Sequence, residues 1–204
     1  MTSVVIVNSG VCNLDSIRRA IEECGGKPNV TDDPRQVEAA DRIILPGVGS
    51  FAAAMQAMNE KGLVAGLRNL LAKRQLPFLG ICLGMQLMAT RSHEFGVTEG
   101  LDLIPGEIVA LKSTQSGERI PHMGWNETFA KPQSPLWQNL PDGTDFYFVH
   151  SYCFDCAPEN VLATCPSYGS FTAAVQRDHL MGVQFHPEKS QKAGFQLLRN
   201  FLAI

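Results

Sequence analysis

In the first half of the chain, short apolar runs that do not alternate with polar residues are each followed by a stretch with helical spacing. Residues 4–7 form such a run, and the apolar residues after it recur three or four positions apart, at Leu14, Ile17, Ile21 and Cys24. A strand that is apolar throughout is covered on both faces, as strands of parallel sheets are. The alternation therefore predicts an α/β fold, in which helices flank a mostly parallel sheet.

The alternation continues to about residue 90 and then changes. Further strands are expected at residues 43–45 and 78–81, and helices at residues 63–71 and 83–89. Beyond residue 107, strand-like runs are separated by turn residues, so we expect added antiparallel strands at residues 107–111, 146–149, 161–164, 172–176 and 181–185. Residues 195–202 carry an apolar stripe that predicts a closing helix, and no linker divides the chain, so one domain is expected over residues 1–204.

Composition excludes some classes of function. The net charge is -3, and basic residues cluster no further than the pairs Arg18-Arg19 and Lys73-Arg74, so a nucleic-acid or membrane-surface binder is not expected. No run approaches the roughly 18 apolar residues of a membrane span, and the start of the chain lacks the features of a secretion signal. We expect a cytoplasmic protein with a small neutral or zwitterionic substrate.

Six cysteines are spread along the chain, which is unlike the disulfide framework of a short secreted protein. Cys153 and Cys156 have the CxxC spacing of zinc and redox sites. No second pair or suitably spaced histidine accompanies them, so we expect buried thiols, no metal and no cofactor.

The strongest chemical signal is a cysteine between two glycines, in Gly80-Ile81-Cys82-Leu83-Gly84. It lies between a predicted strand and a predicted helix, which is the context of a nucleophile elbow. There the unpaired N–H groups of the helix favour a thiolate, and the N–H of Leu83 is directed to a developing oxyanion. The alternative is that Cys82 only fills space in the core.

A cysteine nucleophile needs a base, and His186-Pro187-Glu188 supplies one after the predicted strand at residues 181–185. Glu188, two positions after His186 in extended chain, lies on the same face and can hold the imidazole in one tautomer. A surface His-Pro-Glu turn would have the same sequence. A second source of oxyanion donors is the segment Gly47-Val48-Gly49 after the strand at residues 43–45, although glycines of an ordinary turn would look the same.

The elbow and the His-Pro-Glu motif resemble those of the class I, triad-type glutamine amidotransferases. Further segments are similar to the glutaminase subunit of imidazole glycerol phosphate synthase, and they lie at residues 45–49 (LPGVG), 121–126 (PHMGWN), 147–152 (YFVHSY) and 182–190 (GVQFHPEKS). The resemblance covers essentially the whole chain. It implies a class I amidotransferase fold, which is flavodoxin-like.

The resemblance also implies roles for single residues. Cys82 would be the nucleophile, His186 the acid and base, and Glu188 the residue that orients His186. The glutamine-binding residues would be Gln86, Glu94, His150, Ser151 and Tyr152, and the segment from Gly47 to Gly49 would be the oxyanion strand. For Glu94 there is an independent reason, because a zwitterionic substrate needs a carboxylate for its ammonium group.

As a member of that family, the chain would release ammonia from L-glutamine into a (β/α)8 cyclase subunit, forming a heterodimer that makes imidazole glycerol phosphate and an aminoimidazole carboxamide ribotide by-product in histidine biosynthesis. Met123 and Trp125 would face this partner. Residues 8–13 match the family only loosely, so interface contacts of Ser9 and Cys12 stay open. Three alternatives remain: a glutaminase of anthranilate or aminodeoxychorismate synthase, a stand-alone γ-glutamyl cysteine hydrolase, and a non-enzymatic binding module.

Overall fold

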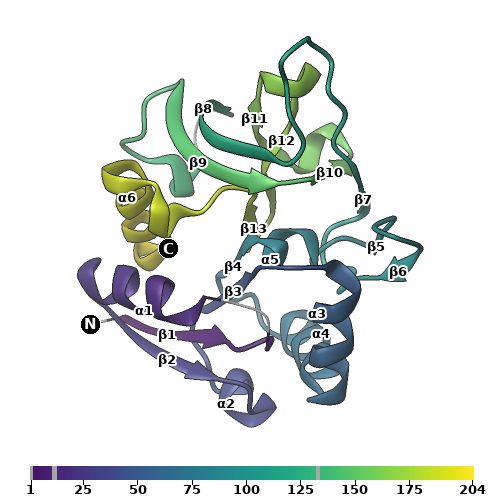
Figure 1. Cartoon of the computed structure of the whole chain (residues 1–204). Helices are drawn as coiled ribbons and strands as arrows, with labels where there is room; N and C mark the ends of the chain where they lie inside the picture. The colour runs from purple at the N-terminus through teal and green to yellow at the C-terminus, as the bar shows by residue number, and fades with distance from the viewer. Residues whose placement is uncertain (1, 11–12, 132–133) are drawn as a thin grey trace.

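The structure, a computed structural model, describes residues 2–10, 13–131 and 134–204. A sheet runs through the molecule, with helices on two sides of its first part and a β-rich region beyond (Figure 1). The helices are α1 (Leu14–Glu23), α2 (Pro34–Glu38), α3 (Phe51–Glu60), α4 (Leu63–Lys73), α5 (Leu83–Gln86) and α6 (Gln191–Ala203). The strands are β1 (Thr2–Val7), β2 (Gly26–Thr31), β3 (Ile43–Gly47), β4 (Phe78–Cys82), β5 (Arg91–Ser92), β6 (Thr98–Glu99), β7 (Gly106–Ala110), β8 (His122–Ala130), β9 (Thr144–His150), β10 (Tyr152–Cys156), β11 (Val161–Cys165), β12 (Phe171–Arg177) and β13 (Leu180–Val183).

The expected mostly parallel sheet with antiparallel additions is confirmed. Strands β2, β1, β3, β4 and β13 are neighbours in that order and run parallel. Antiparallel pairing begins where β13 meets β12 and continues through β10 and β7. One detail differs from the expectation, because β13 comes from the second half of the chain yet joins the parallel part beside β4.

Two hydrophobic cores explain why residues 4–7 of β1 show no alternation with polar residues. Val5 and Val7 of β1 pack in one core, beneath α2, α3 and α4, while Val4 and Ile6 pack in the other, beneath α1 and α6. Successive side chains of a strand point to opposite faces, so a strand between two cores must be apolar at every position. The second core extends into the β8–β9 and β11–β12 region.

The helix after Cys82 is shorter than expected and ends at Gln86 instead of residue 89. The carbonyl groups of Leu87 and Met88 accept hydrogen bonds from the N–H groups of Leu101 and Leu103, at 2.7 and 2.9 Å. These tertiary partners replace the bonds that would have continued the helix. A single turn carries little macrodipole, so the expected help from a helix terminus at Cys82 is reduced to the first N–H groups.

Cys153 and Cys156 both lie in β10, three positions apart, and so project to opposite faces of the sheet. Cys156 packs against the core under α3 and α4, and Cys153 against the core under α1 and α6. Burial raises the pKa of each thiol to about 11. None of the helices in the described part of the chain is long and apolar enough to cross a membrane.

Candidate active site

Three neighbouring strands end at the same edge of the sheet and bring the predicted catalytic residues together. Cys82 is the last residue of β4, Gly47 is the last residue of β3 and lies beside it in register, and His186 follows the end of β13. Since β3, β4 and β13 are parallel neighbours, their carboxyl ends meet. Ligand sites of open α/β sheets form at this edge.

The turn at Cys82 has the strained backbone of a nucleophile elbow. Cys82 has φ 53° and ψ -111°, a region that residues with a side chain rarely adopt. A Cβ on Gly84 would lie 1.7 Å from the Leu45 carbonyl oxygen, and one on Gly80 would lie 2.7 Å from the Gly84 oxygen. Both glycines are therefore required by the close approach of backbone to backbone.

His186 and Glu188 form a buried pair behind the cysteine. The distance from His186 Nδ1 to Glu188 Oε1 is 2.8 Å, and the two side chains are 3% and 6% exposed. Burial opposes protonation of His186, but the neighbouring Cys82 side chain and the Glu188 carboxylate outweigh it and raise the histidine pKa to about 9. His186 Nε2 has no hydrogen-bond partner within the described residues, so it is available to the sulfur or a substrate.

A second polar group beside the sulfur was missed from the sequence. Gln184 Nε2 lies 3.8 Å from Cys82 Sγ, and Gln184 Oε1 accepts a hydrogen bond from Gln86 Nε2 at 3.0 Å. Gln86 Nε2 also donates to the Tyr152 carbonyl at 3.0 Å. Gln184 is fully buried two positions before His186, on the same side of extended chain, but the sequence alone does not show this burial.

A cavity of about 480 Å³ opens over Cys82, which is within the usual size of small-molecule sites. All five predicted glutamine-binding residues line it, as do Val48, Gly49 and Leu83 of the predicted oxyanion hole. The full lining is Val48, Gly49, Cys82, Leu83, Gln86, Glu94, Phe95, Pro121, Val149, His150, Ser151, Tyr152 and His186. Phe95, Pro121 and Val149 were not anticipated. Gly47 packs instead against the elbow, where an added Cβ would lie 3.0 Å from Leu83 Cβ.

Glu94 has a structural contact besides its place in the cavity. Its Oε2 accepts a hydrogen bond of 2.7 Å from the N–H of Phe51, the first residue of α3. Ser50 is the N-cap residue of this helix, and its side chain makes no capping bond. Glu94 therefore caps α3 and joins the cavity to the segment that follows Gly49.

Both ring nitrogens of His150 are engaged by protein groups. Nδ1 lies 2.9 Å from the Tyr152 carbonyl oxygen, and Nε2 lies 2.9 Å from His122 Nδ1. Burial lowers the His150 pKa to about 4, so the ring is neutral. His150 lines the cavity with its ring already fully hydrogen-bonded.

The remaining predicted residues are placed as follows. Met123 and Trp125 are 63% and 44% exposed, whereas Ser9 is completely buried. Cys12 lies outside the described residues. Within the described part of the chain, no three His, Cys, Asp or Glu residues gather as ligands for a metal ion.

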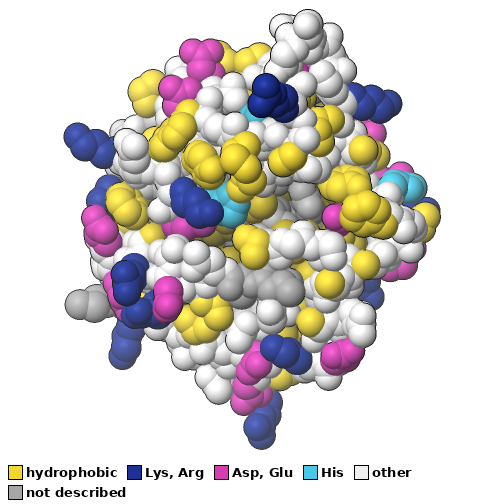
Figure 2. Space-filling view, in the orientation of Figure 1, with side chains coloured by type: hydrophobic (Ala, Val, Ile, Leu, Met, Phe, Trp, Pro, Cys, Tyr) yellow, Lys and Arg dark blue, Asp and Glu magenta, His cyan; other side chains and the backbone are white. Residues whose placement is uncertain are grey.

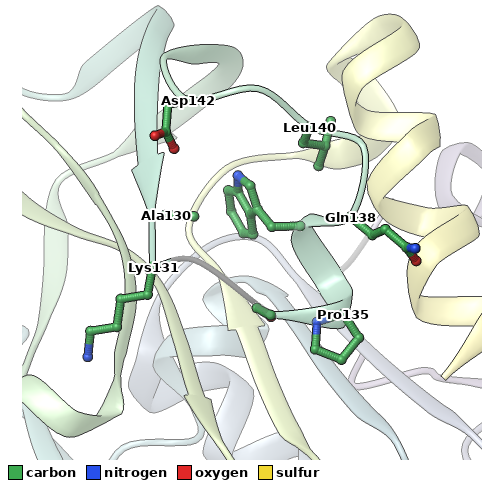
Figure 3. Close-up of a pocket in the computed structure, with 8 residues that line it drawn as sticks. Ala130, Lys131, Pro135, Gln138, Leu140 and Asp142 are labelled. Atoms are coloured by element: carbon green, nitrogen blue, oxygen red, sulfur yellow. The ribbon is translucent and has the colours of Figure 1, made fainter.

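A separate cavity of about 520 Å³ shares no lining residue with the one at Cys82. Pro135, Gln138 and Leu140 line one side of it, and Ala130, Lys131 and Asp142 lie around the other side (Figure 3). It contains no residue of the Cys82, His186 and Glu188 group.

Comparison with known proteins identifies the family. The family described as glutamine amidotransferase class-I matches residues 5–204. The chain is 46% identical to the imidazole glycerol phosphate synthase subunit HisH of Moorella thermoacetica, over 98% of this chain and 94% of that protein. It is 44% identical to the HisH subunit of Syntrophotalea carbinolica, over 97% and 98% of the two chains, and 42% identical to that of Methanosarcina barkeri, over 99% and 98%.

Solved structures with the same fold are much more distant in sequence. A crystal structure of a glutamine amidotransferase superposes with a TM-score of 0.77 at 17% identity, covering 98% of this chain and 97% of the other. A chain in the structure of PurLQS from Thermotoga maritima gives a TM-score of 0.75 at 18% identity, covering 100% and 99%. The chain belongs to the class I glutamine amidotransferases and, within them, to the family of imidazole glycerol phosphate synthase HisH subunits.

Proposed function

We propose that the chain is the glutaminase subunit of an imidazole glycerol phosphate synthase, hydrolysing L-glutamine to glutamate and ammonia with Cys82 as the nucleophile. The observation that carries the proposal is the strained Cys82 at the floor of the cavity, beside the buried His186–Glu188 pair. The names of the HisH relatives supply the pathway, which is histidine biosynthesis.

In the first half of the reaction, the Cys82 thiolate attacks the side-chain amide carbon of glutamine and forms a tetrahedral intermediate. The N–H of Leu83 and an N–H of the Val48–Gly49 segment stabilise the oxyanion. His186 donates the proton at Nε2 to the departing nitrogen, so ammonia leaves and a glutamyl thioester remains. Glu188 holds the imidazole in the required orientation through Nδ1.

In the second half, water cleaves the thioester. His186 takes a proton from the water, whose oxygen attacks the thioester carbon, and the sulfur leaves as the Cys82 thiolate. One glutamine and one water thus give one glutamate and one ammonia. The Glu94 carboxylate at the cavity wall is suited to the substrate ammonium group, while Ser151 and Tyr152 offer hydroxyl and backbone donors for its carboxylate.

The proposed partner is a (β/α)8 cyclase subunit that receives the ammonia. Two large exposed hydrophobic side chains, Val48 and Phe95, line the cavity. Ile120, Met123 and Trp125 are also exposed, in the segment that contains Pro121 of the cavity wall. Figure 2 shows hydrophobic side chains gathered in the middle of one face of the molecule. Such patches mark protein interfaces, and a covering subunit would keep ammonia from escaping into water.

The test is glutamate release from glutamine by the purified chain alone, with a cyclase subunit, and with that subunit and its nucleotide substrate. Cys82→Ala serves as the control. We expect little activity from the isolated chain and strong activation by the liganded cyclase, on the hypothesis that the Gly47–Val48 peptide rotates on partner binding and completes the oxyanion hole. High activity without a partner would exclude this regulation and favour a stand-alone hydrolase. Activity that survives Cys82→Ala would exclude the mechanism.

A further inference from the structure

A pair of histidines beside the cavity is enclosed by aromatic rings. His122 stacks on Phe148 with ring centroids 5.1 Å apart, and Tyr168 lies 4.9 Å away. The ring of Phe171 lies 5.5 Å from His122 and 4.8 Å from His150. Burial lowers the pKa of both histidines, so both rings are neutral at neutral pH.

When both rings are neutral, only one assignment of donors and acceptors satisfies the hydrogen bonds around this pair. A carbonyl oxygen accepts only, so His150 Nδ1 must donate to Tyr152, which leaves His150 Nε2 as an acceptor. His122 Nδ1 must then donate to it, and His122 Nε2 accepts from Asn126 Nδ2 at 2.6 Å. Ser167 Oγ donates to Asn126 Oδ1 at 2.9 Å and fixes the orientation of that amide.

The chain of hydrogen bonds ends on groups that surround the cysteine. The Tyr152 carbonyl oxygen accepts from His150 and also from Gln86 Nε2. Gln86 Nε2 is shared with Gln184 Oε1, and Gln184 Nε2 lies 3.8 Å from Cys82 Sγ. The position of the Tyr152 carbonyl therefore sets the positions of the Gln86 and Gln184 side chains.

We propose that His122, held by Asn126, is a positioning residue for glutamine hydrolysis, acting through His150 on the Tyr152 carbonyl and hence on Gln86 and Gln184 beside Cys82. This inference rests on the function proposed above. His122 itself does not line the cavity, so it acts without touching the substrate. His150 is also a positioning residue, because both of its ring nitrogens are hydrogen-bonded to protein groups and neither is free to bind glutamine. It holds the backbone at Ser151 and Tyr152.

The proton arrangement can be measured without activity. Long-range ¹⁵N–¹H spectra of the full chain should show His122 and His150 both as neutral rings protonated on Nδ1, which is the less common tautomer of free histidine. A protonated ring or an Nε2–H tautomer at either residue at neutral pH would overturn the proposal. Asn126→Leu removes the donor to His122 Nε2, so the His122 ring should no longer be held in a single tautomer and its spectrum should show both.

Activity is then compared in His122→Phe and His122→Asn, with the cyclase subunit and its nucleotide present. Phenylalanine keeps the stacking but cannot donate, so kcat/KM for glutamine should fall about 10- to 100-fold, as small misplacements in active sites do. Asparagine carries an amide nitrogen near the place of Nδ1, so it should restore most of the activity. Phe171→Leu is the matched control, because Phe171 packs on both rings without joining the hydrogen bonds.

A second readout separates positioning from general loosening of the fold. In His122→Phe, inactivation by a glutamine-like diazo-ketone should slow more than alkylation by iodoacetamide, since only the former uses the glutamine subsite. Equal slowing of both reagents, or kinetics no different from Phe171→Leu, would refute the role of His122. If His122→Phe does not fold, Asn126→Leu is assayed in its place against the same criteria. Absence of glutamine turnover in the wild type with its partner would refute the proposed function, while the spectra and reagent selectivity would still decide the role of His122.

Discussion

His186 illustrates how two neighbours set the charge of one residue. Its raised pKa of about 9 reflects the Cys82 side chain and Glu188, which together overcome the cost of burial. An imidazolium that is stable at neutral pH matches the first step of the proposed reaction, in which His186 must give a proton to the leaving nitrogen. Cys82 and Glu188 thus prepare His186 to act first as an acid.

The same pKa predicts how stability depends on pH. In the unfolded chain His186 titrates near 6.5, so the stabilisation of its protonated form is fully present below that pH and is lost as pH rises through about 9. The loss should amount to a few kcal/mol in the free energy of unfolding, measured by urea denaturation between pH 6 and 10. Glu188→Gln should flatten this dependence and lower kcat by about 100-fold or more. An unchanged pH profile in Glu188→Gln would contradict this account of His186.

At the residue scale, the sequence reveals those site residues that are marked by their chain neighbours. Cys82 lies between glycines, and Glu188 follows His186 at a spacing that extended chain brings to one face. His122 and Gln184 have no such local mark. His122 meets His150 only because β8 and β9 pair in that register, and Gln184 meets Cys82 across 102 positions of sequence. Register and long-range packing are not readable from one sequence.

At the scale of elements, the elbow depends on how closely α5 approaches β3. Gly84→Ala would place a methyl group 1.7 Å from the Leu45 carbonyl oxygen, and neither backbone can yield without moving the strand. We expect a loss of about 3 kcal/mol or more in the free energy of unfolding, measured by urea denaturation. Gly66→Ala is the matched control, because Gly66 lies within α4 and its added Cβ would meet only Pro34, at 3.5 Å. This substitution should leave the stability unchanged or raise it by about 1 kcal/mol. Equal stability of the two variants would contradict the steric account of the elbow.

Glu94 joins an element to the site, and two substitutions separate its two roles. Glu94→Ala removes the cap of α3 and should cost about 1 kcal/mol of stability. Glu94→Gln keeps an oxygen for the Phe51 N–H, so its stability should stay near that of the wild type. Both variants lose the negative charge and should raise KM for glutamine about tenfold or more. A normal KM in Glu94→Gln would exclude Glu94 as the ammonium site, and full stability of Glu94→Ala would exclude the cap.

Elements with a clear hydrophobic pattern in the sequence were predictable, and the others depend on their tertiary partners. Residues 4–7 of β1 and all of β3 and β4 lack polar side chains because each strand lies between two cores. Strand β2 alternates buried and exposed residues at the edge of the sheet and was not predicted. Strand β8 was recognised only as a motif, because Gly124 and several polar residues interrupt its pattern. The end of α5 is set by hydrogen bonds from residues more than ten positions later.

At the scale of the whole molecule, the site joins segments from across the chain at one edge of the sheet. The proposed triad spans residues 82–188, and the cavity lining begins at Val48. The parallel order of β3, β4 and β13 brings these segments together. The α/β pattern of the sequence implied a shared edge for β3 and β4, whereas the parallel place of β13, which brings His186 to that edge, was not predicted. The expectation of a single domain over residues 1–204 stays a prediction.

The exposed face of β8 gives a prediction about the assembly. Residues 123, 125, 127 and 129 alternate outward along this strand, and Trp125 packs edge-on to Tyr147 with ring centroids 6.0 Å apart. If the cyclase subunit covers the exposed face of β8, Trp125 is a rigid aromatic anchor within the interface. Trp125→Ala should raise the Kd of the heterodimer by about 30-fold, measured by calorimetry, and should lower the stability of the isolated chain by only about 1 kcal/mol, the worth of the Tyr147 contact. Phe129→Ala is the matched control, because Phe129 is 42% exposed on the same face but lies farther from Met123 along the strand. Unchanged affinity in Trp125→Ala would mean that the partner does not bind at β8. An equal loss of affinity in both variants would mean that the interface reaches Phe129 at the end of the strand.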